Sequence, residues 1–217
     1  ASAAAERALA IRWGAVLRFE ETFTPEFFQR LAQGGCARIY FGLESASQRV
    51  LDLMRKGCRA EEIQRALDYC DRAGVGVETG ILFGFPGETP EEARLTRDFV
   101  IRNKGKITRP DAGMFRLLKG APITGCLDAF GLAATGRSAG AWNQLGYARA
   151  GGDALIQTGA LVRVAVDDPE FSKHWDHGTD LVGDSADSIP GRPAASAAAL
   201  EALAAPVEVR EHCRLRR

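Results

Sequence analysis

The feature that most constrains this chain is a regular alternation between short apolar segments and amphipathic segments with helical periodicity. The apolar segments, which we predict to be strands, are residues 15–20, 37–44, 75–83 and 112–118. Helical segments separate them in the order β, α, β, αα, β, α, β, so we expect an α/β fold with a parallel sheet and right-handed crossovers. Four strands are too few to close a barrel, and the first strand would be left as an open edge.

Capping signals locate two of the helices. Thr24 and Pro25 suit the N-cap and the first position of a helix. Thr89 and Glu92 have the spacing of a capping box, which marks a second helix start. For the helix that follows Thr89, we predict a buried stripe of Leu95, Phe99 and Val100.

The periodic signal weakens in the last third of the chain, which suggests three regions. Residues 1–125 hold the α/β pattern, residues 126–183 form an extension, and residues 184–217 are a tail rich in Ala and Pro. We expect helices to recur in the extension around residues 142–150 and 155–166. The composition of the tail predicts a flexible segment.

Composition limits the classes of partner. Lys plus Arg and Asp plus Glu each number 28, and this balance argues against binding of nucleic acid through bulk charge. No apolar run is long enough to span a membrane, and the N-terminus has no apolar core of a secretory signal. We therefore expect a cytoplasmic protein whose partner is a small-molecule substrate or a missing N-terminal segment.

The cysteines and histidines show no spacing that is typical of a metal site. The cysteines are Cys36, Cys58, Cys70, Cys126 and Cys213. No pair has CxxC spacing and no set has CxxxCxxC spacing, so we predict free thiols. His174 and His177 have H-x-x-H spacing, but only aspartates lie nearby as further ligands, and we predict no metal there.

Charged groups and glycines gather where the predicted strands end. The first strand ends near Arg18, the second at Glu44 and Ser45, and the third in the glycine-rich run 80–88. Ligands of parallel α/β folds bind at the carboxyl ends of strands. Glycines allow a ligand to approach the backbone, and Lys56 adds a cation nearby, so this edge suits a polar ligand.

Each of these features also has a local interpretation that the sequence leaves open. Glu44 could make only a salt bridge near its own strand, and Arg18 could pair with an acidic neighbour in sequence. The run 84–87 could be only a turn before a helix. Lys56 could serve as the cation that a helix C-terminus favours.

Several short motifs, taken together in this order, resemble radical S-adenosylmethionine (SAM) enzymes, in particular the cobalamin-binding group. They are Trp13–Arg18 (WGAVLR), Gly42–Ser45 (GLES), Val50-Leu51, Met54–Gly57 (MRKG) and Gly84–Thr89 (GFPGET). The resemblance covers about residues 7–125. It implies the later strands of a partial parallel βα barrel, with SAM and a [4Fe–4S] cluster as cofactors and cobalamin in part of the group. The activity it implies is reductive cleavage of SAM for radical methyl transfer or rearrangement.

The resemblance also implies a set of SAM-binding residues. By position in the motifs they are Arg18, Glu44, Ser45, Lys56, Gly80, Leu82, Gly84 and Phe115. In such enzymes a residue at the place of Glu44 contacts the ribose or methionine part of SAM, and a cation at the place of Lys56 lies near the SAM carboxylate. The backbone of Gly80–Gly84 would contact adenine, with Phe115 beside it. No catalytic residue is implied.

The chain departs from the family at the cluster, because it has no CxxxCxxC loop and thiolates must hold an iron–sulfur cluster. We therefore hypothesise a truncated piece of a longer enzyme, inactive by itself. Two alternatives remain. An α/β barrel lyase would use Lys56 as an imine-forming amine beside Glu44. A degenerate half-barrel would act as a binding or assembly module and would not bind SAM.

Overall fold

The computed structural model describes residues 11–138, 145–149 and 168–174, and within these residues a four-stranded sheet is the central element. Its strands are β1 (Trp13–Leu17), β2 (Cys36–Glu44), β3 (Gly76–Phe83) and β4 (Ile107–Met114). They pair in the order β1-β2-β3-β4, and every pair is parallel. The predicted parallel α/β sheet is confirmed.

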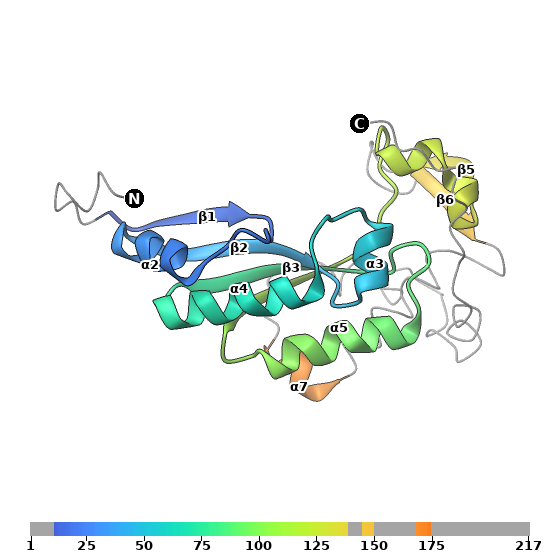
Figure 1. Cartoon of the computed structure of the whole chain (residues 1–217). Helices are drawn as coiled ribbons and strands as arrows, with labels where there is room; N and C mark the ends of the chain where they lie inside the picture. Colours follow the sequence, from blue (N-terminus) through green and yellow to red (C-terminus); the bar gives the residue numbers. More distant parts are fainter. Residues whose placement is uncertain (1–10, 139–144, 150–167, 175–217) are drawn as a thin grey trace.

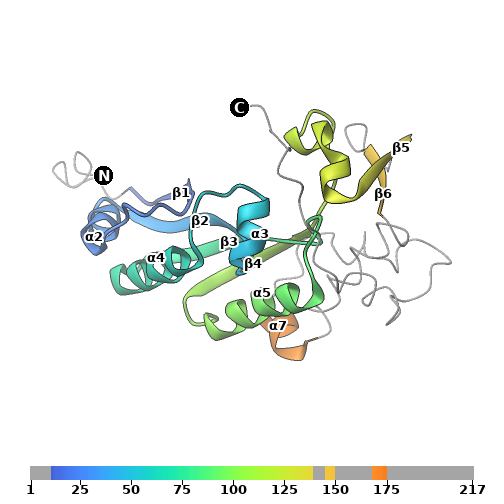
Figure 2. The same ribbon diagram turned by 45° about the vertical axis from the view of Figure 1, so that its right-hand side comes forward.

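Helices cover one face of this sheet. They are α2 (Pro25–Gln33), α3 (Gln48–Leu53), α4 (Ala60–Ala73) and α5 (Pro90–Arg102). Since neighbouring strands follow one another in sequence, right-handed crossovers place the connecting helices on the same side. Figures 1 and 2 show α2, α4 and α5 together on that side.

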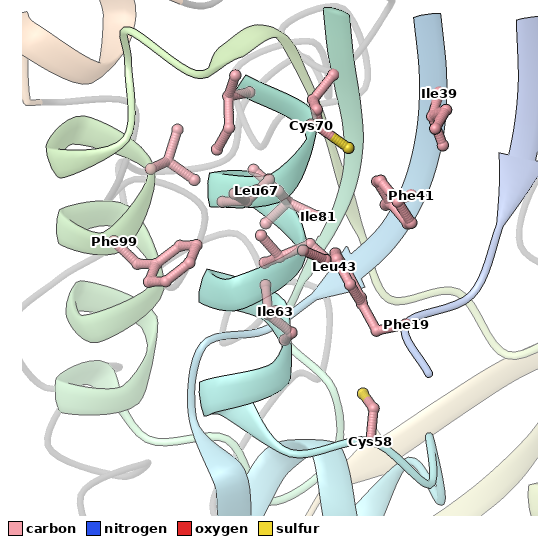
Figure 3. Close-up of a cluster of buried hydrophobic side chains, with 14 of the residues drawn as sticks. Phe19, Ile39, Phe41, Leu43, Cys58, Ile63, Leu67, Cys70, Ile81 and Phe99 are labelled. Atoms are coloured by element: carbon pink, nitrogen blue, oxygen red, sulfur yellow. The ribbon is translucent and has the colours of Figure 1, made fainter. Parts of the chain in front are cut away.

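Burial alternates along the strands and separates an apolar face from a polar one. The fully buried positions of β2 are Ile39, Phe41 and Leu43, which pack with Ile63 and Leu67 of α4 (Figure 3). The positions between them and after them are half-buried and lie on the opposite face: Tyr40, Gly42 and Glu44. Because successive side chains of a strand point to opposite faces, the helix-free face of the described sheet carries polar residues and glycines.

The predicted helix starts are correct, but the stripe predicted for α5 is wrong at one position. The Thr24 hydroxyl accepts a hydrogen bond from the Phe27 amide, and Thr89 and Glu92 form the predicted capping box. Leu95 is 45% exposed. The buried face of α5 instead contains Ala93, Thr96, Phe99 and Val100. Ala93, Thr96 and Val100 recur at helical spacing and define the buried face, and Leu95 lies outside it.

Two predicted strands are displaced from their observed positions. The first begins at Trp13 and ends at Leu17 rather than spanning 15–20. The last begins at Ile107 and ends at Met114 rather than spanning 112–118. Arg109 and Pro110 conceal the start of β4, because proline disfavours a central strand; β4 lies at an edge of the described sheet, where proline is tolerated.

A second, smaller unit follows β4. Two 3-10 turns, η1 (Pro122–Gly125) and η2 (Leu127–Phe130), precede strands β5 (Leu132–Ser138) and β6 (Leu145–Arg149). The two strands pair antiparallel. The buried side chains of this unit form a separate cluster, namely Phe115, Leu117, Ile123, Ala129, Phe130, Leu132 and Tyr147.

The helix predicted around residues 142–150 is wrong, since residues 145–149 form β6. Tyr147 of β6 is buried and pairs with Ala134 across the hairpin, so tertiary packing outweighs the weak local pattern. Helix α7 (Pro169–His174) buries Phe171 against Phe83 of the main core. The predicted helix at 155–166 and the tail at 184–217 lie outside the described residues.

The cysteines follow the free-thiol prediction in part. Cys36, Cys58 and Cys70 are buried free thiols. Cys126 is disulfide-bonded, which contradicts the prediction at that position, because spacing in sequence does not reveal proximity in space. Among the described residues, no helix is long and apolar enough to cross a membrane.

Candidate functional site

Three of the predicted site residues meet at the carboxyl edge of the sheet. The Lys56 ammonium donates to Glu44 Oε1 at 3.0 Å, and the Arg18 guanidinium donates to the carbonyl of Lys56. The side chains of Lys56 and Glu44 are 22% and 27% exposed, so a ligand can reach both. This cluster places two cations and one carboxylate where β1 and β2 end.

The backbone at Glu44 is unusual. Its φ is 60°, in the left-handed region that non-glycine residues rarely occupy, and the β2–β3 register shifts between Gly42 and Glu44. Such a conformation costs about 1–3 kcal/mol and concentrates at ligand sites. The left-handed backbone of Glu44 therefore supports a functional role for this residue, independently of any sequence motif.

Gly42 and Gly80 keep space open on the helix-free face. A Cβ at Gly42 would lie 2.8 Å from Glu44 Oε1 and 3.0 Å from Lys56 Nζ. A Cβ at Gly80 would lie 2.5 Å from the Tyr40 hydroxyl. A side chain at either position would therefore displace the ends of Glu44, Lys56 or Tyr40.

The same face carries polar residues that the sequence analysis did not select. The Tyr40 hydroxyl donates to Asp111 Oδ2 at 3.4 Å, and burial together with the Asp111 carboxylate raises the pKa of Tyr40. Arg38 and Glu78 form an ion pair at 3.5 Å. A pocket of about 380 Å³ is lined by Gly14, Ala15, Val16, Arg38, Tyr40 and Glu78. In the sequence, Arg38 and Tyr40 alternate with apolar residues along β2, and this alternation could have identified the polar face.

The glycine-rich run after β3 is held from both sides. The Gly84 amide donates to Glu88 Oε2 at 2.5 Å, and the Gly84 carbonyl accepts from Arg149 Nη2 at 2.7 Å. Glu88 is 1% exposed, and burial raises its pKa to about 8. Neither Glu88 nor Arg149 was among the predicted site residues, and Arg149 is far away in sequence.

Leu82 lies within the run 80–88, near the end of β3, and Phe115 directly follows β4. Leu82 is half-buried and packs against the second core cluster. Phe115 is buried, and its ring makes T-shaped contacts with Phe85 and Tyr147. The structure therefore places both predicted residues at the ends of β3 and β4, where they pack with other apolar side chains of the second cluster.

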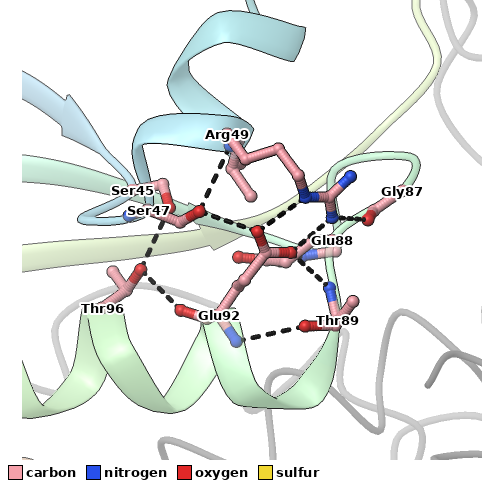
Figure 4. Close-up of polar contacts among 10 residues, drawn as sticks. Ser45, Ser47, Arg49, Gly87, Glu88, Thr89, Glu92 and Thr96 are labelled. Atoms are coloured by element: carbon pink, nitrogen blue, oxygen red, sulfur yellow. Dashed lines mark hydrogen bonds and ion pairs between the residues drawn. The ribbon is translucent and has the colours of Figure 1, made fainter. Parts of the chain in front are cut away.

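Ser45 follows Glu44 directly but points elsewhere. It is fully buried, and its hydroxyl shares a hydrogen bond of 3.1 Å with Thr96 of α5 (Figure 4). The Thr96 hydroxyl also accepts from the Ala46 amide at 3.0 Å. Ser45 thus joins the end of β2 to α5, away from the Arg18–Glu44–Lys56 cluster.

Glu92 organises the polar contacts beside Ser45 (Figure 4). It accepts from Arg49 Nε at 2.9 Å and Nη2 at 2.6 Å, from the Ser47 hydroxyl at 2.8 Å and from the Thr89 amide at 2.9 Å. Burial opposes ionisation of Glu92, but these donors, Arg49 first among them, lower its pKa. Arg49 also donates to the Gly87 carbonyl. The network ties α3, the 84–88 turn and α5 together.

The described residues do not fit an iron–sulfur cluster. Cluster ligands are thiolates, whereas burial raises the pKa values of Cys36, Cys58 and Cys70, the last to about 12. Within the described ranges, no group of three His, Cys, Asp or Glu side chains could hold a metal ion. His177 lies outside these ranges, so the H-x-x-H pair is not placed.

The arrangement defines a class of protein. A parallel βα sheet with helices on one face and a polar opposite face is the wall of a partial βα barrel, and its charged edge lies where such folds bind ligands. Residues 7–100 match the radical SAM superfamily. This match confirms the resemblance to that superfamily that the sequence motifs predicted.

Curated relatives match part of the chain. An uncharacterised methyltransferase of Pyrococcus horikoshii is 34% identical over 94 residues, which are 43% of this chain and 20% of the relative. A tRNA-2-methylthio-N(6)-dimethylallyladenosine synthase of Akkermansia muciniphila is 40% identical over 70 residues, which are 30% of this chain and 15% of the relative. The chain thus spans a fifth or less of these proteins.

Solved structures agree on the fold. The radical SAM methyltransferase TsrM of Kitasatospora setae, with cobalamin and a [4Fe–4S] cluster bound, superposes with a TM-score of 0.52 at 22% identity. The match covers 64% of this chain and 30% of TsrM. Elp3 of Methanocaldococcus infernus superposes with a TM-score of 0.52 at 13% identity, covering 71% of this chain and 32% of Elp3. Both likenesses confirm a partial radical SAM-type fold.

Proposed function

We propose that the sheet edge of this chain is a SAM-binding wall of a radical SAM enzyme. The observation that carries the proposal is the Arg18–Glu44–Lys56 cluster at the carboxyl edge, within the segment that matches the superfamily. Charged groups of both signs, reachable from solvent, suit a ligand that carries both an ammonium and a carboxylate group.

Each part of SAM has a chemically suitable partner in this wall. The Glu44 carboxylate can accept from the ribose hydroxyls or the ammonium group of SAM. The Lys56 ammonium can meet the SAM carboxylate, while Arg18 holds the backbone of Lys56 in place. The adenine of SAM would lie beside the turn that begins at Gly84, where β3 ends. Bound SAM supplies the methyl group or the radical precursor of the reaction.

The role of this chain is SAM binding rather than electron delivery. The described residues offer no thiolate set for a cluster, so we assign them no step that involves one. The whole protein, as we propose it, joins this wall to a cluster and catalyses methyl transfer or a related radical reaction. The methyltransferase and methylthio-synthase names of the relatives support that reaction class, and the cobalamin-bound TsrM supports cobalamin as a further cofactor.

A lyase that forms an imine at Lys56 has less support. Imine formation needs a free amine, whereas the Lys56 ammonium donates to Glu44 at 3.0 Å. The ion pair therefore favours a binding role for Lys56 over a nucleophilic one. A binding module without catalysis would share the same fold, and only ligand binding separates it from the SAM-binding wall.

Calorimetric titration of the chain with SAM tests the proposal. We expect weak but measurable binding, and Glu44→Gln should weaken it by about 10-fold or more, because a hydrogen bond to a charged group contributes about 1.5–3 kcal/mol. Glu61→Gln, on an exposed carboxylate of α4, is the matched control and should leave the affinity unchanged. A folded chain that does not bind SAM would favour the non-catalytic binding module.

A further inference from the structure

Gly84 is held by two side chains that come from different parts of the fold. Glu88, four residues later, accepts from its amide, and Arg149 of β6 donates to its carbonyl. Gly84 has a φ of 78°, a conformation that glycine adopts readily and leaves just as readily. Contacts to both of its polar groups therefore restrict a turn that would otherwise sample many conformations.

The hairpin that carries Arg149 is attached to the ends of the main sheet at further points. The Tyr147 hydroxyl donates to the Phe115 carbonyl at 3.4 Å, and the Leu145 amide donates to the Leu117 carbonyl at 2.8 Å. Figure 1 shows β5 and β6 beyond the carboxyl ends of the sheet strands. The hairpin thus lies on the side of the sheet where parallel α/β folds bind their ligands.

Burial of the Glu88 and Arg149 side chains is energetically unfavourable. Glu88 is 1% exposed, and its Oε1 atom has no hydrogen-bond partner among the described residues. Nε and Nη1 of Arg149 also have no hydrogen-bond partner among the described residues. Burial disfavours the charged form of this side chain and lowers its pKa. Buried polar atoms without partners destabilise the folded state. The hydrogen bonds to Gly84 are the favourable contacts that the two side chains make at this position.

We propose that Arg149 is a positioning residue for the cofactor, because it fixes the Gly84 turn, beside which SAM would bind. This inference rests on the proposed SAM-binding function and extends it to residues beyond the matched segment 7–100. Hairpin β5–β6 is then part of the cofactor site, although it contributes no side chain to the Arg18–Glu44–Lys56 cluster.

Amide hydrogen exchange of the whole chain, with and without SAM, tests the proposal. In Arg149→Met, the Gly84 amide should exchange about 10-fold faster without SAM, because opening of the turn no longer breaks the bond to its carbonyl. SAM affinity should fall by about 5-fold or more. Arg149→Lys keeps a charged donor and should restore both quantities in part. Arg94→Met, on an exposed arginine of α5, is the control.

A spectroscopic readout checks that the Arg149 charge acts on Glu88, and SAM affinity separates positioning from simple packing. Burial raises the pKa of Glu88, and the Arg149 charge opposes that effect. Carbon NMR of the Glu88 carboxyl should therefore show a higher pKa in Arg149→Met than in the wild type, and Arg149→Lys should return it towards the wild-type value. If Arg149→Met does not fold, Arg149→Lys alone should show faster Gly84 exchange than the wild type.

The outcomes distinguish this inference from the proposed function. Unchanged Gly84 exchange in the folded Arg149 variants overturns the positioning role. Faster exchange with unchanged SAM affinity overturns it as well, since the clamp would then be only structural. A wild-type chain that binds no SAM contradicts the proposed function itself, and the positioning role with it.

Discussion

At the residue scale, single glycines and carboxylates determine how side chains pack on the helix-free face. Gly80 is one of the predicted site residues, and Gly42 belongs to the GLES motif. The structure shows that Glu44 with Lys56 and Tyr40 occupy the space that a Cβ would need. Substitutions at these positions therefore test side-chain packing on the helix-free face.

Gly80→Ala should destabilise the protein by about 1–3 kcal/mol, the usual cost of overpacking. Its Cβ would lie 2.5 Å from the Tyr40 hydroxyl and 3.3 Å from Tyr40 Cζ. Combining it with Tyr40→Phe should recover part of the loss, because the closest atom is removed. Urea denaturation measures both. Gly105→Ala, where a Cβ meets no atom within 4 Å, should be nearly neutral. Additive effects of Gly80→Ala and Tyr40→Phe would contradict this account.

Glu88 should make stability depend on pH. Its pKa is about 8 in the folded protein, above the ordinary value of 4.5. Between these values the folded state binds more protons than the unfolded state, so the free energy of unfolding should fall as the pH rises from about 4.5 to 8. Glu88→Gln should flatten this part of the profile. Denaturation at a series of pH values checks it, and an identical slope in wild type and variant would be inconsistent with a buried, protonated Glu88.

At the element scale, the start of α5 depends on Glu92. Glu92→Ala should destabilise the protein by about 1–3 kcal/mol, because Arg49, Ser47 and the Thr89 amide lose a shared acceptor. Glu91→Ala, one residue earlier and exposed, should change stability by less than about 0.5 kcal/mol. Thermal or chemical denaturation compares the two. Equal losses would show that the network contributes no more than a surface ion pair.

Elements with explicit local signals could be predicted from sequence, and elements that tertiary packing determines could not. Thr24 and Thr89 are N-cap residues, and they mark the starts of α2 and α5 in the sequence. Strand β4 was displaced because Pro110 interrupts its pattern. Strand β6 was mistaken for helix, because the burial of Tyr147 that stabilises it comes from distant residues.

The candidate site was predictable to a similar degree. Arg18, Glu44 and Lys56 were selected from the carboxyl ends of strands and from motifs, and the structure brings them together. Ser45 shares the same motif, but a strand positions alternate residues on opposite faces, and it bonds to Thr96 instead. Arg149 could not be found in this way, since its only link to Gly84 is spatial.

At the scale of the whole molecule, the sheet has a helix-covered apolar face and a polar face with a charged carboxyl edge. The chain spans 20% and 15% of the two curated relatives described above. We therefore propose SAM binding at the carboxyl edge for this chain itself, and a radical SAM activity only for the whole protein.

The most direct test is an NMR titration of the isotope-labelled chain with SAM. We predict that amide shift changes concentrate at residues 42–45, 56–57 and 80–84, which form the carboxyl edge, and that α2 on the other face stays unchanged. Shift changes confined to the helix-covered face, or none at all in a folded chain at millimolar SAM, would contradict the claim.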